Sequence, residues 1–231
     1  LPWTGRGTTK GEIAAPYAFR PTATNTVRPA LTTTPETTPT ATRMPAKPVD
    51  VPPGEALVFA DDFSDPGIVW TYDGRPGALM GRADERMVVA TDKPDEIALA
   101  FSPVRFDDGA LEVTVQRDAD DGSFAGVYFG PKSGGFYFLL LDDSNYALMQ
   151  EYGDTIRTVI APRSSPALLP RTGAHRLRIE RTGGHVVLFV DGTKLTAIDQ
   201  PYLAERGPFA LLAIASSDNP TTIRYDDVLV T

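Results

Sequence analysis

Alternating apolar and polar side chains predict β-strands along most of the chain after residue 55. Leu111–Gln116 and His175–Arg181 alternate with period two, which is typical of strands with one buried face. Val186–Val190 is apolar at every position, which predicts a central strand. It is followed by Asp191-Gly192 and then by Lys194–Ile198, and Asp-Gly between two such runs predicts a β-hairpin.

The rest of this region also consists of short apolar runs separated by residues typical of turns. Gly, Pro, Asp and Ser separate the apolar runs, and no long window has the 3.6-residue period of a helix; Tyr202–Arg206 could form one turn. About a dozen short strands predict an all-β, antiparallel jelly-roll β-sandwich over residues 55–231. Further strands are expected at Phe124–Phe129, Phe136–Leu141, Tyr146–Glu151, Thr155–Ile160, Phe209–Ala215 and Ile223–Val230. The predicted core includes Leu111, Val113, Val115, Phe138, Leu140, Leu177, Ile179, Val187 and Phe189.

Residues 1–54 differ sharply in composition, with 13 Thr and 10 Pro. Proline fixes φ and removes donors, and Thr and Pro bury little apolar surface, so this segment is expected to be an extended tail or stalk. Its few large apolar side chains are candidate anchors on a partner surface. They are Trp3, Ile13, Tyr17 and Phe19.

Charge and cysteine content exclude several classes. The net charge of −8 divides into +3 for residues 1–54 and −11 for the remainder, so nucleic acid is an unexpected partner and the tail is expected to favour acidic surfaces. The absence of cysteine excludes a disulfide scaffold, a thiol nucleophile and a Cys-ligated metal. The sequence contains no run of 18 apolar residues, so no membrane-spanning helix is predicted.

The order of several segments is similar to a known superfamily. The segments are Phe59–Asp65 leading to Trp70, then Gly126–Phe129, Phe136–Leu139, Asn145–Leu148, His175–Ile179, Val187–Gly192 and Tyr225–Val230. Residues 56–231 resemble the concanavalin A-like lectin/glucanase superfamily, and within it the bacterial laminin-G-like and 3-keto-disaccharide hydrolase type modules. The resemblance implies a jelly roll and a bacterial extracellular or cell-surface location. It does not fix an activity, because this fold carries lectins, glycosidases, adhesins and scaffolding modules.

Catalytic motifs are missing. The glucanases of this superfamily carry Glu-x-Asp-x-Glu or Glu-x-Asp-x-x-Glu on one strand, and neither pattern occurs here. The nearest candidate, Glu112, is followed on its own strand face by Thr114 and Gln116. Gly-x-Ser-x-Gly is also absent, and the two histidines are interpreted as exposed residues at strand ends. No catalytic residue is therefore predicted, and the protein is not expected to be an enzyme.

Tyrosines on successive strands suggest a ligand site. Sugars stack on aromatic rings while polar side chains bind their hydroxyls, so Tyr128, Tyr137, Tyr146, Gln150 and Arg157 are the predicted ligand-binding residues. The alternative is that these rings pack between the sheets. A pair on one strand face, Arg176 and Arg178, could hold an acidic glycan or a neighbouring subunit, or could simply face solvent.

Acidic pairs at both ends of the domain suggest a structural calcium site. First and last strands commonly pair in this fold, which would gather the four carboxylates of Asp61, Asp62, Asp226 and Asp227. No other cofactor is expected. The alternative is that they are ordinary acidic turns, with Arg224 nearby to offset their charge.

Together these patterns favour a non-catalytic, extracytoplasmic binding module that recognises a glycan or a cell-surface partner. The alternative is a structural subunit of a cell-surface filament or envelope assembly, with the tail packed on neighbouring subunits. A third possibility, a glycoside hydrolase, lacks its motif.

Overall fold

The computed structural model describes residues 51, 53–73, 77–93, 96–118, 122–131, 135–142, 144–153, 155–170, 172–216 and 220–231. The tail through residue 50, with Trp3, Ile13, Tyr17 and Phe19, lies outside the described residues, so its conformation and the boundary at residue 54 remain predictions. In the described part of the chain, no helix is long and apolar enough to cross a membrane.

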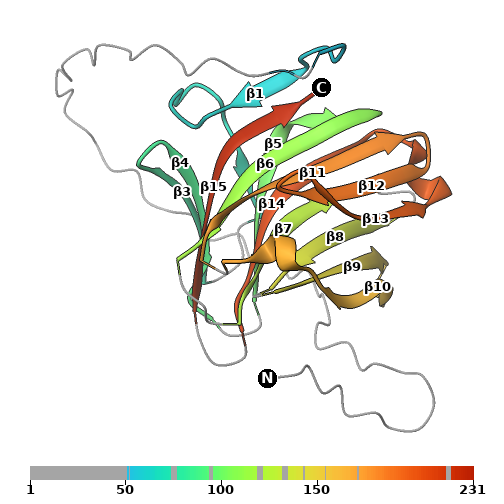
Figure 1. The fold of residues 1–231 in the computed structure, drawn as a ribbon. Coiled ribbons are helices and arrows are strands. Elements are labelled where there is room, and N and C mark those ends of the chain that lie inside the picture. The colour runs from blue at the N-terminus through green and yellow to red at the C-terminus, as the bar shows by residue number, and fades with distance from the viewer. Residues whose placement is uncertain are drawn as a thin grey trace, which may run out of the picture. The chain divides into compact units, whose positions relative to one another are not determined.

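Two antiparallel sheets form the predicted jelly-roll sandwich (Figure 1). The eight-stranded sheet has the order β13-β12-β11-β6-β15-β4-β3, and β1 also pairs with β15. First and last strands therefore pair as expected, with Asp61 opposite Val228. The strands are β1 Phe59–Asp61, β3 Ala78–Ala83, β4 Arg86–Thr91, β6 Gly109–Arg117, β11 Ala174–Thr182, β12 His185–Val190, β13 Thr193–Asp199 and β15 Thr221–Val230.

The seven-stranded sheet has the order β10-β9-β8-β7-β14-β5-β2. Its meander β7-β8-β9-β10 is the one that the alternating runs predict, because short breaks join strands that are neighbours in sequence. The strands are β2 Thr71–Tyr72, β5 Ile97–Phe106, β7 Phe124–Phe129, β8 Phe136–Leu141, β9 Asn145–Tyr152, β10 Thr155–Ser164 and β14 Gly207–Ile214. Two 3-10 turns, η2 Pro166–Leu168 and η3 Pro201–Ala204, join β10 to β11 and β13 to β14, and η3 confirms the expected single turn.

The inner faces of the two sheets bury the main core. The alternating strands place their apolar residues there as predicted, with Leu111, Val113 and Val115 from β6 and Leu177 and Ile179 from β11. Alternate side chains of a strand share one face, so each apolar residue at this spacing adds to the same buried layer.

Strand β12 differs from its prediction. The core takes Val186, Leu188 and Val190, while Val187 and Phe189 belong to the opposite face and are only partly buried. A strand that is apolar at every position gives no alternation from which to choose its inner face. It also lies next to the edge strand β13 and is not central.

Strand β8 shows a second departure, and it exposes a feature of the whole sheet. Its core residues are Tyr137, Leu139 and Leu141, whereas Phe138 is buried in a separate cluster and Leu140 is only partly buried. This second cluster lies on the side of the seven-stranded sheet that points away from the eight-stranded sheet. We call it the apolar face; it comprises Ile97, Leu99, Phe101, Phe124, Tyr128, Phe136, Phe138, Leu140, Met149, Ala210, Leu212 and Ile214.

Candidate functional site

Strand register brings three of the predicted ligand-binding residues together. Tyr137 on β8 is opposite Gln150 on β9, and Gln150 is opposite Arg157 on β10. Residues directly opposite one another in neighbouring strands place their side chains side by side on one face. The three side chains therefore form a polar row across β8, β9 and β10, which are adjacent in the sheet (Figure 1).

Hydrogen bonds tie this row to the turn η3. The Nε of Arg157 donates to the Oε1 of Gln150 at 2.5 Å, and the Tyr137 hydroxyl donates to the Oε1 of Gln200 at 3.0 Å. Gln150 is buried while Arg157 is exposed, so the row runs from the interior to solvent. Burial raises the pKa of Tyr137, and Arg157 offsets only part of that rise, so the hydroxyl stays protonated at neutral pH.

Two exposed tyrosines flank the row. Tyr202 in η3 is 59% exposed, two residues from Gln200, and Tyr152 is 62% exposed, two residues beyond Gln150 on the same face of β9. Two exposed rings beside fixed polar groups have the composition of a sugar site. We call this group the tyrosine–arginine rim; it comprises Tyr137, Gln150, Tyr152, Arg157, Gln200 and Tyr202.

Sequence reasoning did not assign Gln200 or Tyr202 to the site. They come from the β13–β14 connection, about 50 residues from the tyrosine strands, and no local pattern relates the two segments. The available signal was Tyr202 itself, a large ring that follows Pro201 in a turn too short to bury it.

The other two predicted tyrosines do not join this group. Tyr146 lies in the main core, where its hydroxyl donates to the Leu195 carbonyl at 3.0 Å. Tyr128 lies on the apolar face, stacked on Phe136 with ring centroids 4.5 Å apart. The alternative that the rings pack between the sheets holds for Tyr137 and Tyr146, whereas pairing opposite Phe138 puts Tyr128 on the outer side of the sheet. Ligand binding itself stays a prediction.

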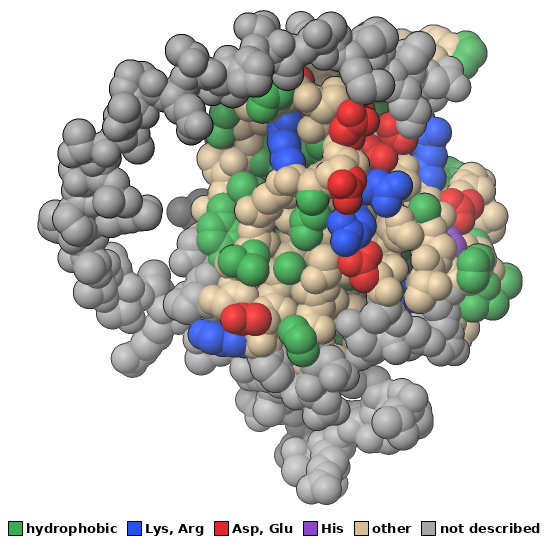
Figure 2. Space-filling view, turned by 90° about the vertical axis from the view of Figure 1, so that its left-hand side faces the viewer, with side chains coloured by type: hydrophobic (Ala, Val, Ile, Leu, Met, Phe, Trp, Pro, Cys, Tyr) green, Lys and Arg blue, Asp and Glu red, His purple; other side chains and the backbone are tan. Residues whose placement is uncertain are grey.

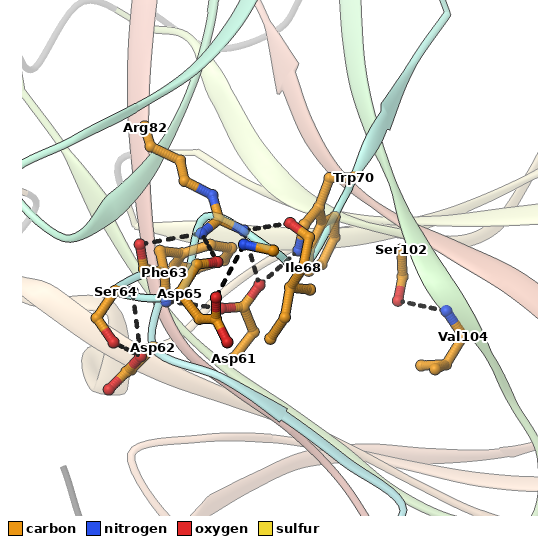
Figure 3. Close-up of polar contacts among 11 residues, drawn as sticks. Asp61, Asp62, Phe63, Ser64, Asp65, Ile68, Trp70, Arg82, Ser102 and Val104 are labelled. Atoms are coloured by element: carbon orange, nitrogen blue, oxygen red, sulfur yellow. Dashed lines mark hydrogen bonds and ion pairs between the residues drawn. The ribbon is translucent and has the colours of Figure 1, made fainter. Parts of the chain in front are cut away.

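Asp61, the first residue of the predicted calcium group, fastens a loop (Figure 3). Its buried carboxylate accepts from the Phe63 amide and the Trp70 indole, both at 2.8 Å. Arg82 lies 3.4 Å away and also donates to the carbonyls of Phe63, Asp65 and Ile68. Burial raises the pKa of Asp61, and the Trp70 hydrogen bond offsets part of this rise.

The other three predicted calcium ligands have different surroundings. Asp62 accepts two hydrogen bonds from Ser64, and Asp226 lies 3.7 Å from the Nε of Arg86 and accepts from the Asp227 amide. A shift in the β15–β6 register between Asp226 and Leu229 breaks the alternation at this end of β15. Among the described residues, no three Asp, Glu or His side chains come together in a way that could hold a metal ion. The predicted gathering of four carboxylates therefore does not form, and calcium binding remains a prediction without a site.

The two arginines of β11 are paired with acids. Glu112 is buried and accepts from both Arg176 and Arg178, and Arg178 also binds Glu55 and Glu180. Burial alone would lower the pKa of Arg178, but the three carboxylates have the larger effect, so the pKa lies above its ordinary value. On the side of the molecule shown in Figure 2, acidic and basic side chains lie next to one another. The positive charges of Arg176 and Arg178 are thus neutralised by neighbouring glutamates, and Glu112 is not a free carboxylate.

Each histidine pairs with an aspartate. His175 is buried, contrary to expectation, with Nδ1 2.8 Å from Asp191 and Nε2 3.0 Å from the Pro170 carbonyl. His185 is exposed, as expected, with Nδ1 2.8 Å from Asp199. Both ring nitrogens of His175 are engaged, so the pair fastens the start of β11.

Carboxylates are scarce on the seven-stranded sheet. Its strands contain one acidic residue, Glu151 on β9. A two-carboxylate glycosidase mechanism needs a pair about 5–5.5 Å or 6.5–9.5 Å apart. The strands of this sheet cannot supply that pair.

Comparisons with known proteins identify the fold. No protein-family model and no curated protein matches the sequence. Among solved structures, the carbohydrate binding module CBM66 from Bacillus subtilis matches with TM-score 0.55 and 15% identity over 69% of this chain and 92% of that chain. The laminarinase catalytic domain from Thermotoga maritima matches with TM-score 0.57 and 14% identity, over 76% and 97%. A structure from work on endo-acting O-glycanases of human gut bacteria, which initiate mucin breakdown, matches with TM-score 0.59 and 16% identity, over 76% and 99%.

These neighbours include both a binding module and catalytic domains. At 14–16% identity the likeness shows the fold alone. It confirms the jelly roll expected from the superfamily resemblance, and any activity has to be argued from this chain's own residues.

Proposed function

We propose that this concanavalin A-like sandwich is a non-catalytic glycan-binding module that works outside the cytoplasm. The observation that carries the proposal is the distribution of carboxylates: the seven-stranded sheet has only Glu151 on its strands. On the other sheet, Glu112 is held by two arginines and Asp61 by Trp70 and Arg82. The strands of the seven-stranded sheet thus offer polar and aromatic groups for binding and one carboxylate, whereas the glycosidase mechanism needs two.

The tyrosine–arginine rim is the proposed sugar contact. Tyr202 and Tyr152 would stack against the C–H faces of sugar rings, as exposed aromatic side chains do in carbohydrate sites. Arg157 carries more N–H donors than its contacts with Gln150 and Tyr137 use, so it would donate to sugar hydroxyls or to a carboxylate. The buried amide of Gln150 fixes the guanidinium, which lowers the entropy cost of binding.

Support for a glycan partner also comes from the solved structures with a similar fold, which include a carbohydrate binding module and enzymes that act on glycans. The Thr/Pro-rich composition of residues 1–54 fits a spacer that holds a domain away from a surface. Both points favour an extracytoplasmic module over an intracellular one.

A glycan array probed with the full chain tests the proposal, followed by mass spectrometry of each bound glycan after prolonged incubation. The expected result is binding of a defined set of glycans whose masses do not change. Shortened glycans would make the protein a hydrolase and overturn its non-catalytic character. Failure to bind any glycan would overturn the glycan partner.

A further inference from the structure

The edge strands of the two sheets differ in how they are protected. An edge strand presents unpaired N–H and C=O groups, and proteins usually protect it with a register shift, a proline, a charged side chain or short length. Strand β10 has two register shifts and Pro162, and β13 has one register shift and Lys194. Strands β1 and β2 have only three and two residues. The remaining edge of the described sheets is β3, at the end of the eight-stranded sheet.

Strand β3 carries none of these features. Its six residues, Ala78–Ala83, pair with β4 without a register shift, and none of them is proline. Its one charged residue is Arg82, whose guanidinium binds Asp61 and three carbonyls of the β1–β2 loop (Figure 3). The charge of Arg82 is therefore already paired within the chain, and β3 is an edge that another strand can approach.

Half of the backbone groups of β3 point to this open edge. The Asp92 amide donates to the Gly77 carbonyl at 2.9 Å, so these two residues form a hydrogen-bonded pair, and every second residue of β3 after Gly77 bonds β4 in the same way. The N–H and C=O groups of the alternate residues point away from β4; these residues are Ala78, Met80 and Arg82. Within the described part of the chain, their one partner at the edge is the Tyr72 hydroxyl, which donates to the Ala78 carbonyl.

The outward side chains of β3 leave space beside this edge. Leu79, Gly81 and Ala83 face away from the core and are exposed, Leu79 to 64%. A Cβ at Gly81 would have no atom within 4 Å, and the backbone there does not have the positive φ that calls for glycine. Glycine inside a strand often marks a place where another chain approaches closely. Val69, in the loop that Arg82 binds, adds a second exposed apolar side chain.

We propose that β3 pairs with β3 of a second copy of this chain, antiparallel about a two-fold axis at Met80. The open backbone groups would then form about six inter-chain hydrogen bonds, with Arg82 opposite the partner's Ala78. Leu79 would lie opposite the partner's Gly81, in the space that the glycine leaves, and the symmetry repeats this contact.

This pairing leaves the tyrosine–arginine rim open. The Tyr146 hydroxyl of β9 donates to the Leu195 carbonyl of β13, so the β9–β10 edge of one sheet lies beside the β13 edge of the other. Strand β3 is at the far end of the eight-stranded sheet from β13 (Figure 1). Each copy in the dimer therefore keeps its own rim.

Sedimentation equilibrium of the full chain tests this proposal, with two variants that change the same two exposed positions. For the unaltered chain, the measured mass should rise from that of one chain to that of two as concentration increases. Leu79→Glu with Gly81→Glu places carboxylates opposite one another at both symmetric contacts, and should raise the dimer dissociation constant about ten-fold or more. Leu79→Lys with Gly81→Glu places opposite charges there, and should recover most of that loss.

A third variant separates this contact from general charge repulsion. Thr193→Glu with Ala197→Glu adds the same charge at exposed positions of β13 and should leave the dimer unchanged. Circular dichroism spectra of all variants should match that of the unaltered chain, since every changed side chain is exposed. The mass of one chain at every concentration would overturn the proposal, as would equal weakening by the β3 and β13 glutamate variants. Equal weakening by both β3 variants would contradict the antiparallel register.

Discussion

At the residue scale, Asp61 shows how a buried carboxyl can act as a fastening point. Its two oxygens accept from the Phe63 amide and the Trp70 indole, and Arg82 balances its charge while binding three carbonyls of the same loop. Phe63 has φ of 59°, a left-handed conformation that a residue with a Cβ rarely adopts. The hydrogen bonds around Asp61 hold that conformation in place.

Asp61→Asn should destabilise the fold by about 1–3 kcal/mol, because an amide offers one acceptor oxygen in place of two and leaves a buried donor without a partner. Burial raises the pKa of Asp61 in the folded chain. The folded state thus holds the proton more tightly, and the contribution of Asp61 is largest below its unfolded pKa of about 4 and falls as pH rises through the folded pKa. Denaturant unfolding of both proteins between about pH 3 and 6 should show their difference shrinking. A constant difference would contradict the raised pKa.

A second residue, Tyr225, links the two sheets. From β15 its buried hydroxyl lies 3.0 Å from both the amide nitrogen and the carbonyl oxygen of Gly126 on β7, and it contacts the Leu212 carbonyl on β14. Gly126 also lets the neighbouring strand β8 approach closely, since a Cβ there would lie 1.8 Å from the Leu139 carbonyl oxygen.

Tyr225→Phe should lower the free energy of unfolding by about 1–3 kcal/mol, because it leaves buried polar groups of the opposite sheet unsatisfied without changing the ring. Urea unfolding measures this loss. Tyr202→Phe is the matched control, since that hydroxyl belongs to an exposed ring and its loss should leave stability unchanged. Equal effects of the two changes would mean that the inter-sheet bonds contribute nothing.

At the scale of elements, the sequence predicts where strands lie better than it predicts which face of a strand is buried or which segments it contacts. Strands with clear alternation, such as β6 and β11, have the inner face that the pattern predicts and extend one or two residues beyond the predicted bounds. Where both faces are apolar, as in β8 and β12, the pattern located the strand but not its inner face. The rim could be predicted only in part for a related reason: Gln150 and Arg157 lie on neighbouring strands, whereas Gln200 and Tyr202 reach them through tertiary folding.

The β3–β4 hairpin was not predicted, and its turn explains why. Asp84 and Glu85 have φ of 53° and 56°, the positive values of a type I′ turn, which usually carries Asn-Gly or Asp-Gly. Asp-Glu gives no such signal in a sequence.

Glu85→Gly should therefore stabilise the protein by about 0.5–1 kcal/mol, because glycine adopts positive φ without the cost borne by a side chain. Thermal unfolding measures the gain. Lys194→Gly, at an exposed position inside β13, should instead destabilise, since glycine weakens a regular strand. A loss of stability from Glu85→Gly would contradict the strain assigned to this turn.

At the scale of the whole molecule, the two sides of the seven-stranded sheet have separate roles in this account. The inner side carries the tyrosine–arginine rim at its edge, where a sugar would bind, and the outer side carries the apolar face, which shares no residue with the rim.

The most direct test of the central claim is a calorimetric titration of the strongest array ligand into three proteins: the unaltered chain, Tyr202→Ala and Leu79→Ala. Leu79 is 64% exposed on β3 and serves as a control for removal of an exposed apolar side chain. Loss of one stacked ring should weaken binding by roughly 1–3 kcal/mol, which is about 5- to 150-fold in Kd. Binding should weaken by this amount for Tyr202→Ala, and the Kd should be unchanged for Leu79→Ala. An unchanged Kd for Tyr202→Ala would contradict a glycan site at the rim.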